Sequence, residues 1–149
     1  MPSVLIVDNN DFFRRSFKKI LEMYIPSISV NESVDGSDAL TKINQFSPDI
    51  VFMEIRLPGT NALELTREIK VLHPNLIINI FISYDIPAYH KVAKEFGVDH
   101  FLLKDTLTGA EIASMVKVVI EKKKGSAENA QSERRNLHKK GFDKSACPS

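Results

Sequence analysis

The stretch Asp49-Ile-Val-Phe-Met-Glu54-Ile-Arg-Leu-Pro-Gly59 decides how the rest of the chain is interpreted. Its apolar run, 50–53, is too short for a helix and is bounded by turn signals, which predicts a buried strand. Glu54 closes the run, and Pro58-Gly59 predicts a turn shortly after it. The stretch therefore predicts an acidic side chain at the end of a buried strand.

Short apolar runs, and one alternating segment at 28–34, occur on both sides of this strand, and each is followed by a segment with helical periodicity. Strands are predicted at 4–7, 28–34, 50–54, 76–83 and 101–103, and helices at 11–25, 36–45, 61–72, 87–96 and 110–122. Five alternating strand–helix pairs require a parallel sheet with helices on both faces and right-handed crossovers. The predicted fold class is therefore α/β, a flavodoxin-like doubly wound sheet with strand order 2-1-3-4-5.

The first predicted helix shows how its two faces are assigned. Asp11 is expected to cap it, and Phe13 and Phe17 lie on its apolar face. Arg14 and Lys18 fall on the other side, which predicts that both are exposed.

The chain of 149 residues is long enough for one ordinary domain, predicted at 1–124. The stretch 125–149 is polar and is expected to be a flexible tail. We expect a cytoplasmic protein, since neither a membrane span nor a secretory signal is evident. The single cysteine, Cys147, cannot form an internal disulfide, which agrees with a reducing compartment.

The net charge of +1 hides an asymmetry between the predicted domain and the tail. Residues 1–121 hold 12 Lys/Arg and 16 Asp/Glu, whereas 122–149 hold 8 and 3. A basic tail can bind nucleic acid or an anionic membrane, but a solvated tail is the simpler interpretation. We therefore expect neither a membrane nor a nucleic-acid partner.

Polar residues follow several of the predicted strands. In an open α/β sheet, ligands bind beyond the carboxyl ends of the strands. This rule gathers Asp8, Asn9, Glu54, Ser83 and Lys104 at one edge. Carboxylates, a hydroxyl and an ammonium could hold a divalent cation and a phosphoryl group, or Asp8 and Lys104 could form a structural ion pair.

The same stretches resemble a response-regulator receiver domain of two-component signalling. The resemblance spans residues 3 to about 121. It is carried by Val4-Leu-Ile-Val-Asp8, Leu57-Pro-Gly-Thr-Asn-Ala-Leu-Glu-Leu65, Ile82-Ser83 and Phe101-Leu-Leu-Lys104. It implies that Glu54 stands at the phosphoacceptor position, which is almost always Asp in this family.

The resemblance also implies roles for the other site residues. Asp8, Asn9 and the backbone carbonyl of Arg56 would bind Mg²⁺. Ser83 would be the switch hydroxyl, Lys104 the charge partner and Phe101 the aromatic switch. Because an amide is a weaker ligand than a carboxylate, Asn9 predicts that Mg²⁺ binding is weak or absent.

Glu54 changes the expected chemistry. Its extra methylene moves the carboxylate by more than about 1 Å, and misplacement on that order can cost about 100-fold in rate. We therefore expect impaired phosphorylation. Glu54 either mimics a phosphorylated acid by reaching Lys104 or Ser83, or is vestigial.

The sequence thus predicts a stand-alone receiver-like signalling module that is not an enzyme and acts by protein–protein contact. Its expected partners are a sensor histidine kinase or a downstream regulator, and homodimerisation is left open. Two alternatives remain: a receiver that uses Mg²⁺ and is phosphorylated on Glu54, and a DNA-associated regulator that uses its basic tail.

Overall fold

A computed structural model describes residues 2–125 of the chain. The predictions for the tail beyond residue 125 and for Cys147 concern residues outside this described part of the chain. The elements are β1 (Ser3–Val7), α1 (Asp11–Tyr24), β2 (Ser29–Ser33), α2 (Gly36–Phe46), β3 (Ile50–Glu54), β4 (Arg56–Leu57), β5 (Thr60–Asn61), α3 (Ala62–Leu72), β6 (Ile77–Ile82), α4 (Pro87–Phe96) and β7 (His100–Leu103). A further helix occupies residues 109–125 and is called the C-terminal helix below.

The main sheet has five parallel strands in the order β2-β1-β3-β6-β7. This order confirms the predicted doubly wound topology, because β6 and β7 are the fourth and fifth strands of the main sheet. All five residues of β3 are buried, as expected for a central strand covered on both faces.

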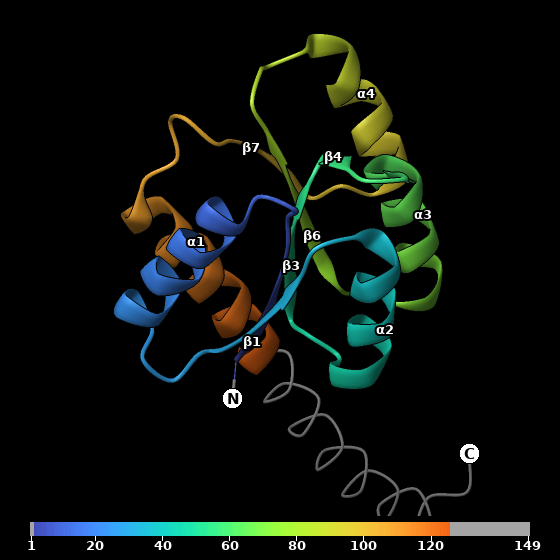
Figure 1. The fold of residues 1–149 in the computed structure, drawn as a ribbon. Helices are drawn as coiled ribbons and strands as arrows, with labels where there is room; N and C mark the ends of the chain where they lie inside the picture. The colour runs from blue at the N-terminus through green and yellow to red at the C-terminus, as the bar shows by residue number, and fades with distance from the viewer. Residues whose placement is uncertain (1, 126–149) are drawn as a thin grey trace, which may run out of the picture.

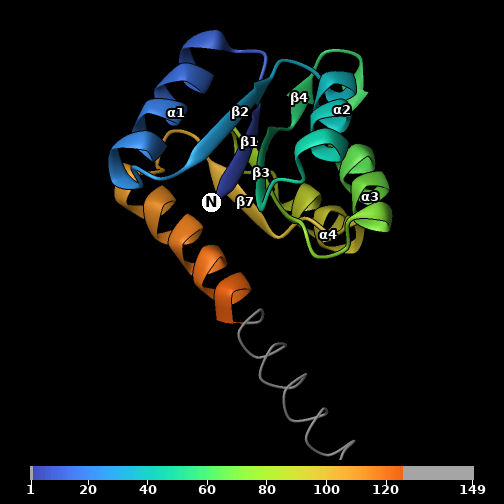
Figure 2. The same cartoon turned by 90° about the horizontal axis from the view of Figure 1, so that it is seen from below.

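Helices cover the two faces of the sheet unequally (Figure 1). The α1 helix and the C-terminal helix lie on one face, while α2, α3 and α4 lie on the other (Figure 2). Each face has its own apolar core. Phe17 and Val116 pack with Phe52 and Phe81 on the first, and Ile43 and Ile69 belong to the core of the second.

Two details differ from the sequence-based expectations. Asn10, not Asp11, is the N-cap of α1, because its side chain accepts a hydrogen bond from Phe13 N at 3.0 Å. Arg14 is buried rather than exposed, with 7% of its surface accessible. Its Nε is bonded to Glu32 of β2, a contact between distant segments that helical periodicity does not reveal.

A small antiparallel ribbon, β4–β5, was also not predicted. Arg56 pairs with Asn61 and Leu57 with Thr60 across the Pro58-Gly59 turn. Gly59 has a φ of 64°, which glycine adopts at little cost. No helix in the part of the chain from residue 2 to 125 is long and apolar enough to cross a membrane.

Candidate functional site

The carboxyl edge of the sheet brings three charged side chains into contact. Asp8 follows β1, Glu54 ends β3 and Lys104 follows β7. The Lys104 Nζ lies 2.8 Å from Asp8 Oδ2 and 2.6 Å from Glu54 Oε2. One ammonium therefore lies against two carboxylates in a largely desolvated position.

Asp8 is fixed by its own backbone surroundings as well as by Lys104. Asp8 is fully buried. Its Oδ1 accepts from Asn10 N at 2.8 Å, and its backbone N–H donates to Ser33 O at 3.0 Å. Both carboxylate oxygens are thus engaged, one by a backbone N–H and one by the Lys104 ammonium.

Glu54 is held less completely. Only 6% of the residue is exposed. Its Oε1 accepts a long bond of 3.4 Å from Arg56 N. Its Oε2 is within ion-pair distance of Lys104, but the angles do not meet hydrogen-bond geometry, so Oε2 has no hydrogen-bond donor within residues 2–125. Attraction to the ammonium is the main interaction of this oxygen.

Lys104 is held over an aromatic surface. Its backbone N–H donates to Ile82 O at 3.0 Å, and its Nζ lies 4.1 Å from the centre of the Phe13 ring. Burial disfavours its charge, but the hydrogen bond to Asp8 and the negative charges of Asp8 and Glu54 outweigh that effect and raise the pKa of Lys104.

The space next to Glu54 is small. A cavity of about 10 Å³ is lined by Glu54 and Ser83 together with Tyr84 and Tyr89. A cavity needs roughly 10–15 Å³ to hold a water molecule. The cavity is therefore at the lower limit for a single water, and a phosphoryl group would require its walls to move.

The other predicted site residues lie around this centre. Ser83 is exposed at the rim of the same cavity. Asn9 is exposed and lines a separate surface cleft with Pro58 and Gly59. The structure brings Asp8, Glu54 and Lys104 together but leaves the Asn9 side chain outside their contacts.

Arg56 and Phe101 contribute in different ways. The Arg56 side chain is exposed, and its backbone N–H faces Glu54. Phe101 is half-buried, and its ring centre lies 5.0 Å from that of His90 on α4. Phe101 thus connects the edge strand β7 to α4. Within residues 2–125, its aromatic contact is with His90 and not with the charged centre.

The charged centre does not fit a Mg²⁺ ion as it is arranged. No group of three or more His, Cys, Asp or Glu side chains suited to a metal occurs within residues 2–125. The two available carboxylates already share the Lys104 ammonium. A divalent cation would have to displace or repel that ammonium to bind both acids.

Three residues that support the centre were not identified as site residues from the sequence. Asn10 N binds the Asp8 carboxylate, Phe13 lies under Lys104, and Arg14 Nη1 donates to Asp8 O at 2.7 Å. All three follow Asp8 within six positions. The signal that could have found them is the strand-to-helix turn itself, which places the first turn of α1 next to the end of β1.

Comparison with known proteins places the chain in a family. The family model for the response regulator receiver domain matches residues 4–117. The transcriptional regulatory protein DegU of Brevibacillus brevis is 29% identical over 118 residues, covering 79% of this chain and 50% of DegU. The response regulator protein VraR of Staphylococcus epidermidis strain RP62A is 30% identical over 120 residues, covering 79% of this chain and 56% of VraR.

Solved structures agree. A two-component response regulator of the LuxR family from Aurantimonas sp. SI85-9A1 superposes with a TM-score of 0.71 at 26% identity, covering 80% of this chain and 84% of that one. A CheY-like receiver domain protein from Methanospirillum hungatei JF-1 shares the fold, with a TM-score of 0.75 at 21% identity over 84% of this chain and 98% of that one. The chain spans about half the length of DegU and VraR. With its receiver fold and a family match over residues 4–117, the chain belongs to the response regulator receiver domains of two-component signalling.

Proposed function

We propose that this receiver domain is impaired in phosphorylation and signals through protein–protein contacts rather than through catalysis. The observation that carries the proposal is the position of the Lys104 ammonium between Asp8 and Glu54, at 2.8 and 2.6 Å. In this arrangement the cation that would balance a phosphoryl group is already balanced by Glu54 itself.

Three features of the site reduce the reactivity of Glu54. Its carboxylate is paired with an ammonium, which stabilises the ground state and weakens the nucleophile. The cavity beside it is about 10 Å³, too small for a phosphoryl group without rearrangement. Its residue is nearly buried, so a phosphodonor has little access. Phosphoryl transfer depends on positioning and charge stabilisation, and both are unfavourable here.

The same geometry supports the hypothesis that Glu54 mimics a phosphorylated acid, rather than being vestigial. Glu54 reaches Lys104, one of the two groups expected to respond to phosphorylation. Ser83, the other such group, lines the same cavity as Glu54. We propose that Glu54 fixes Lys104 in one state and that this state is the form its partners bind.

We further propose that the partners are other signalling proteins, either a sensor histidine kinase or a downstream regulator. Large apolar side chains are exposed next to the site on the β6–α4 connection and on α4, namely Tyr84, Tyr89 and Val92. Such side chains on a surface close to the charged centre offer contact area whose shape depends on that centre. A homodimer is another use of such a surface.

Intact-mass measurement tests the impairment directly. The 149-residue chain would be incubated with acetyl phosphate and Mg²⁺, and a receiver domain with Asp at its acceptor position would serve as the positive control. We expect no stable phosphoryl adduct on this chain. Efficient labelling at Glu54 would replace our proposal with the alternative of a Mg²⁺-dependent phosphoacceptor.

The mimic hypothesis needs a second measurement. Glu54→Gln keeps the side-chain length and removes the charge, so the ¹⁵N spectrum should shift at Ser83 and through α4 as well as at the direct neighbours. Shifts restricted to residues that contact Glu54 would favour the vestigial interpretation.

A DNA-associated role is a second candidate, because several similar proteins are named transcriptional regulatory proteins. The basic stretch 122–149 would carry that role by contacts with phosphates. Salt-sensitive DNA binding by the whole chain, lost when residues 126–149 are removed, would support this candidate over protein contact alone.

A further inference from the structure

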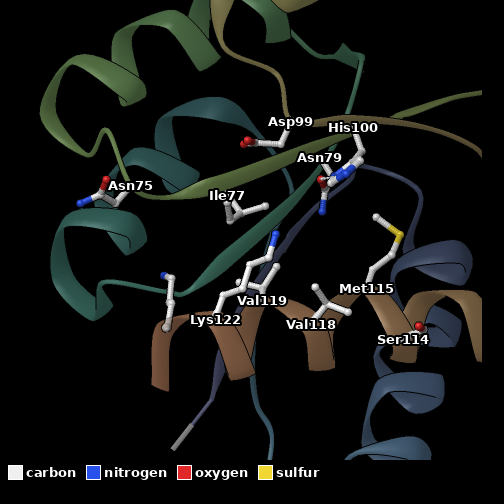
Figure 3. Close-up of a pocket in the computed structure, with 11 residues that line it drawn as sticks. Asn75, Ile77, Asn79, Asp99, His100, Ser114, Met115, Val118, Val119 and Lys122 are labelled. Atoms are coloured by element: carbon white, nitrogen blue, oxygen red, sulfur yellow. Dashed lines mark hydrogen bonds between the residues drawn. The ribbon is translucent and has the colours of Figure 1, made fainter. Parts of the chain in front are cut away.

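A second cleft lies far from the charged centre, at the amino ends of β6 and β7. It has a volume of about 790 Å³ and lies between these strands and the C-terminal helix (Figure 3). Pockets that bind small molecules typically measure about 300–1,000 Å³. Because Glu54 and Lys104 are at the opposite ends of the strands, this cleft does not belong to the site described above.

The walls of the cleft are largely apolar. Ile77 comes from β6, while Met115, Val118 and Val119 come from the C-terminal helix and face it across the cleft (Figure 3). Val118 is 46% exposed, although it lies beside an apolar surface. An apolar ligand body would remove this surface from water, which is favourable.

One buried polar side chain points into the cleft. Asn79 lies in the middle of β6 and is only 2% exposed. Its Oδ1 is 2.9 Å from Nδ1 of His100, which must therefore carry the hydrogen of that bond. Its amide nitrogen is directed toward the cleft (Figure 3). A donor in this position is complementary to an acceptor atom on a ligand.

The charges around the cleft favour an anionic acceptor. Lys122 extends its ammonium from the C-terminal helix toward β6 (Figure 3) and has no ion pair with any described residue. Lys123 is engaged by Asp49, at 3.3 Å from Oδ1. The one carboxylate of the lining, Asp99, accepts from both Lys70 and the backbone N–H of Ile78 at 2.8 Å.

We propose that this cleft binds a small amphipathic carboxylate, a molecule with an apolar chain or ring and one anionic head group. The apolar body would lie between Ile77 and the Val118–Val119 surface. The head group would accept from the amide nitrogen of Asn79 and pair with Lys122. This proposal does not depend on whether phosphorylation of Glu54 is impaired.

Decanoate is a suitable probe, and decan-1-ol is its uncharged counterpart. The ¹⁵N-labelled full chain would be titrated with each, below the concentration at which the probe forms micelles. We expect saturable shifts for Ile77, Val118 and Val119 with decanoate, and weaker binding of the alcohol. Saturable binding elsewhere on the surface, or none, would overturn the proposal.

Two variants test the head-group contacts. Lys122→Gln should weaken decanoate binding about two- to fivefold, the range of a partly exposed ion pair. The matched control Lys117→Gln lies on the same helix outside the cleft lining and should leave the affinity unchanged. Asn79→Leu, which keeps the branched shape and the number of side-chain heavy atoms but removes the amide, should reduce the preference for decanoate over decanol while retaining decanol binding.

The outcomes separate other occupants of the cleft. Equal affinities for decanoate and decanol that neither variant alters would show a merely apolar surface and contradict the proposal. If neither probe binds and sedimentation shows a dimer that Val118→Glu dissociates, the cleft is an interface between two copies of the chain, and the ligand proposal is wrong.

Discussion

The ammonium of Lys104 lies 2.6 Å from Oε2 of Glu54, although the two residues are fifty positions apart in the sequence. The same ammonium donates to Asp8 Oδ2 at 2.8 Å. Two nearly buried carboxylates thus share one cation, and their mutual repulsion is tolerable only while that cation is present. The stability of this edge of the sheet should therefore depend on Lys104 more than on either acid alone.

Removal of the cation should destabilise the domain. Lys104→Met keeps most of the side-chain volume but leaves two buried carboxylates without their partner, and such losses cost on the order of 3 kcal/mol. The free energy of unfolding is measured by urea denaturation. Adding Glu54→Gln to Lys104→Met should recover part of the loss, because one of the two orphaned charges is gone. A Lys104→Met variant as stable as the wild type would show that the ion pairs contribute nothing net.

The contribution of Lys104 to the free energy of unfolding should also change with pH in the alkaline range. Its pKa is raised in the folded state, against the burial of the group, by Asp8 and Glu54. A raised pKa stabilises the fold at pH values below the unfolded pKa of about 10.4, and this contribution is lost as the pH rises through the folded value.

The measurement compares the wild type with Lys104→Met as the pH increases. The difference in unfolding free energy should be constant from about pH 7 to 9 and should shrink above the unfolded pKa of about 10.4. Since other Lys and Tyr residues titrate in both proteins, the difference isolates Lys104. A difference that increases with alkaline pH would mean that the pKa of Lys104 is lowered.

The parts of the fold that the sequence predicted are those with a strong local pattern. The run 50–53 in β3 predicted a strand because it is short, continuously apolar and bounded by turn signals, and α1 was predicted because its apolar residues recur at helical spacing. The β4–β5 ribbon escaped this reasoning because strands of two residues are too short to show a recognisable pattern. The strand-end rule placed Glu54 and Lys104 at one edge from topology alone.

What could not be predicted depends on contacts between distant segments. Arg14 is charged and on the polar side of its helix pattern, yet Glu32 and the carbonyl of Asp8 satisfy it in a buried position. Asn79 was hidden inside the apolar segment 76–83. A polar residue in the middle of such an apolar run can indicate a binding site, but only the structure shows that the C-terminal helix leaves a cleft beside it.

The turn after Asp8 provides a test that does not involve the charged centre directly. Asn10 caps α1 by accepting from Phe13 N. Asn10→Ala should reduce the free energy of unfolding by about 1 kcal/mol, while Asn10→Asp, which can cap equally well, should have little effect. Thermal or urea unfolding of both variants checks this. Equal losses in the two variants would indicate that the amide group has a role other than capping.

The last prediction separates the two proposed defects in phosphorylation. Glu54→Asp shortens the side chain, which should lengthen its distance from Lys104 and enlarge the cavity beside Ser83. If the weak metal site is the larger defect, this change alone should restore little labelling by acetyl phosphate with Mg²⁺. Adding Asn9→Asp gives the cation a further carboxylate beside that of Asp8 and should restore substantially more.

The effects of these two substitutions should be non-additive, because both act on one site. Mg²⁺ affinity, measured separately by calorimetry, controls for the metal. Asn9→Asp alone should improve Mg²⁺ binding without efficient labelling, since Glu54 remains paired with Lys104. If the double variant binds Mg²⁺ and stays folded but is still not labelled, Glu54 and Asn9 do not explain the defect in phosphorylation. The junction between β5 and α3 at Asn61-Ala62 would then be the next segment to change.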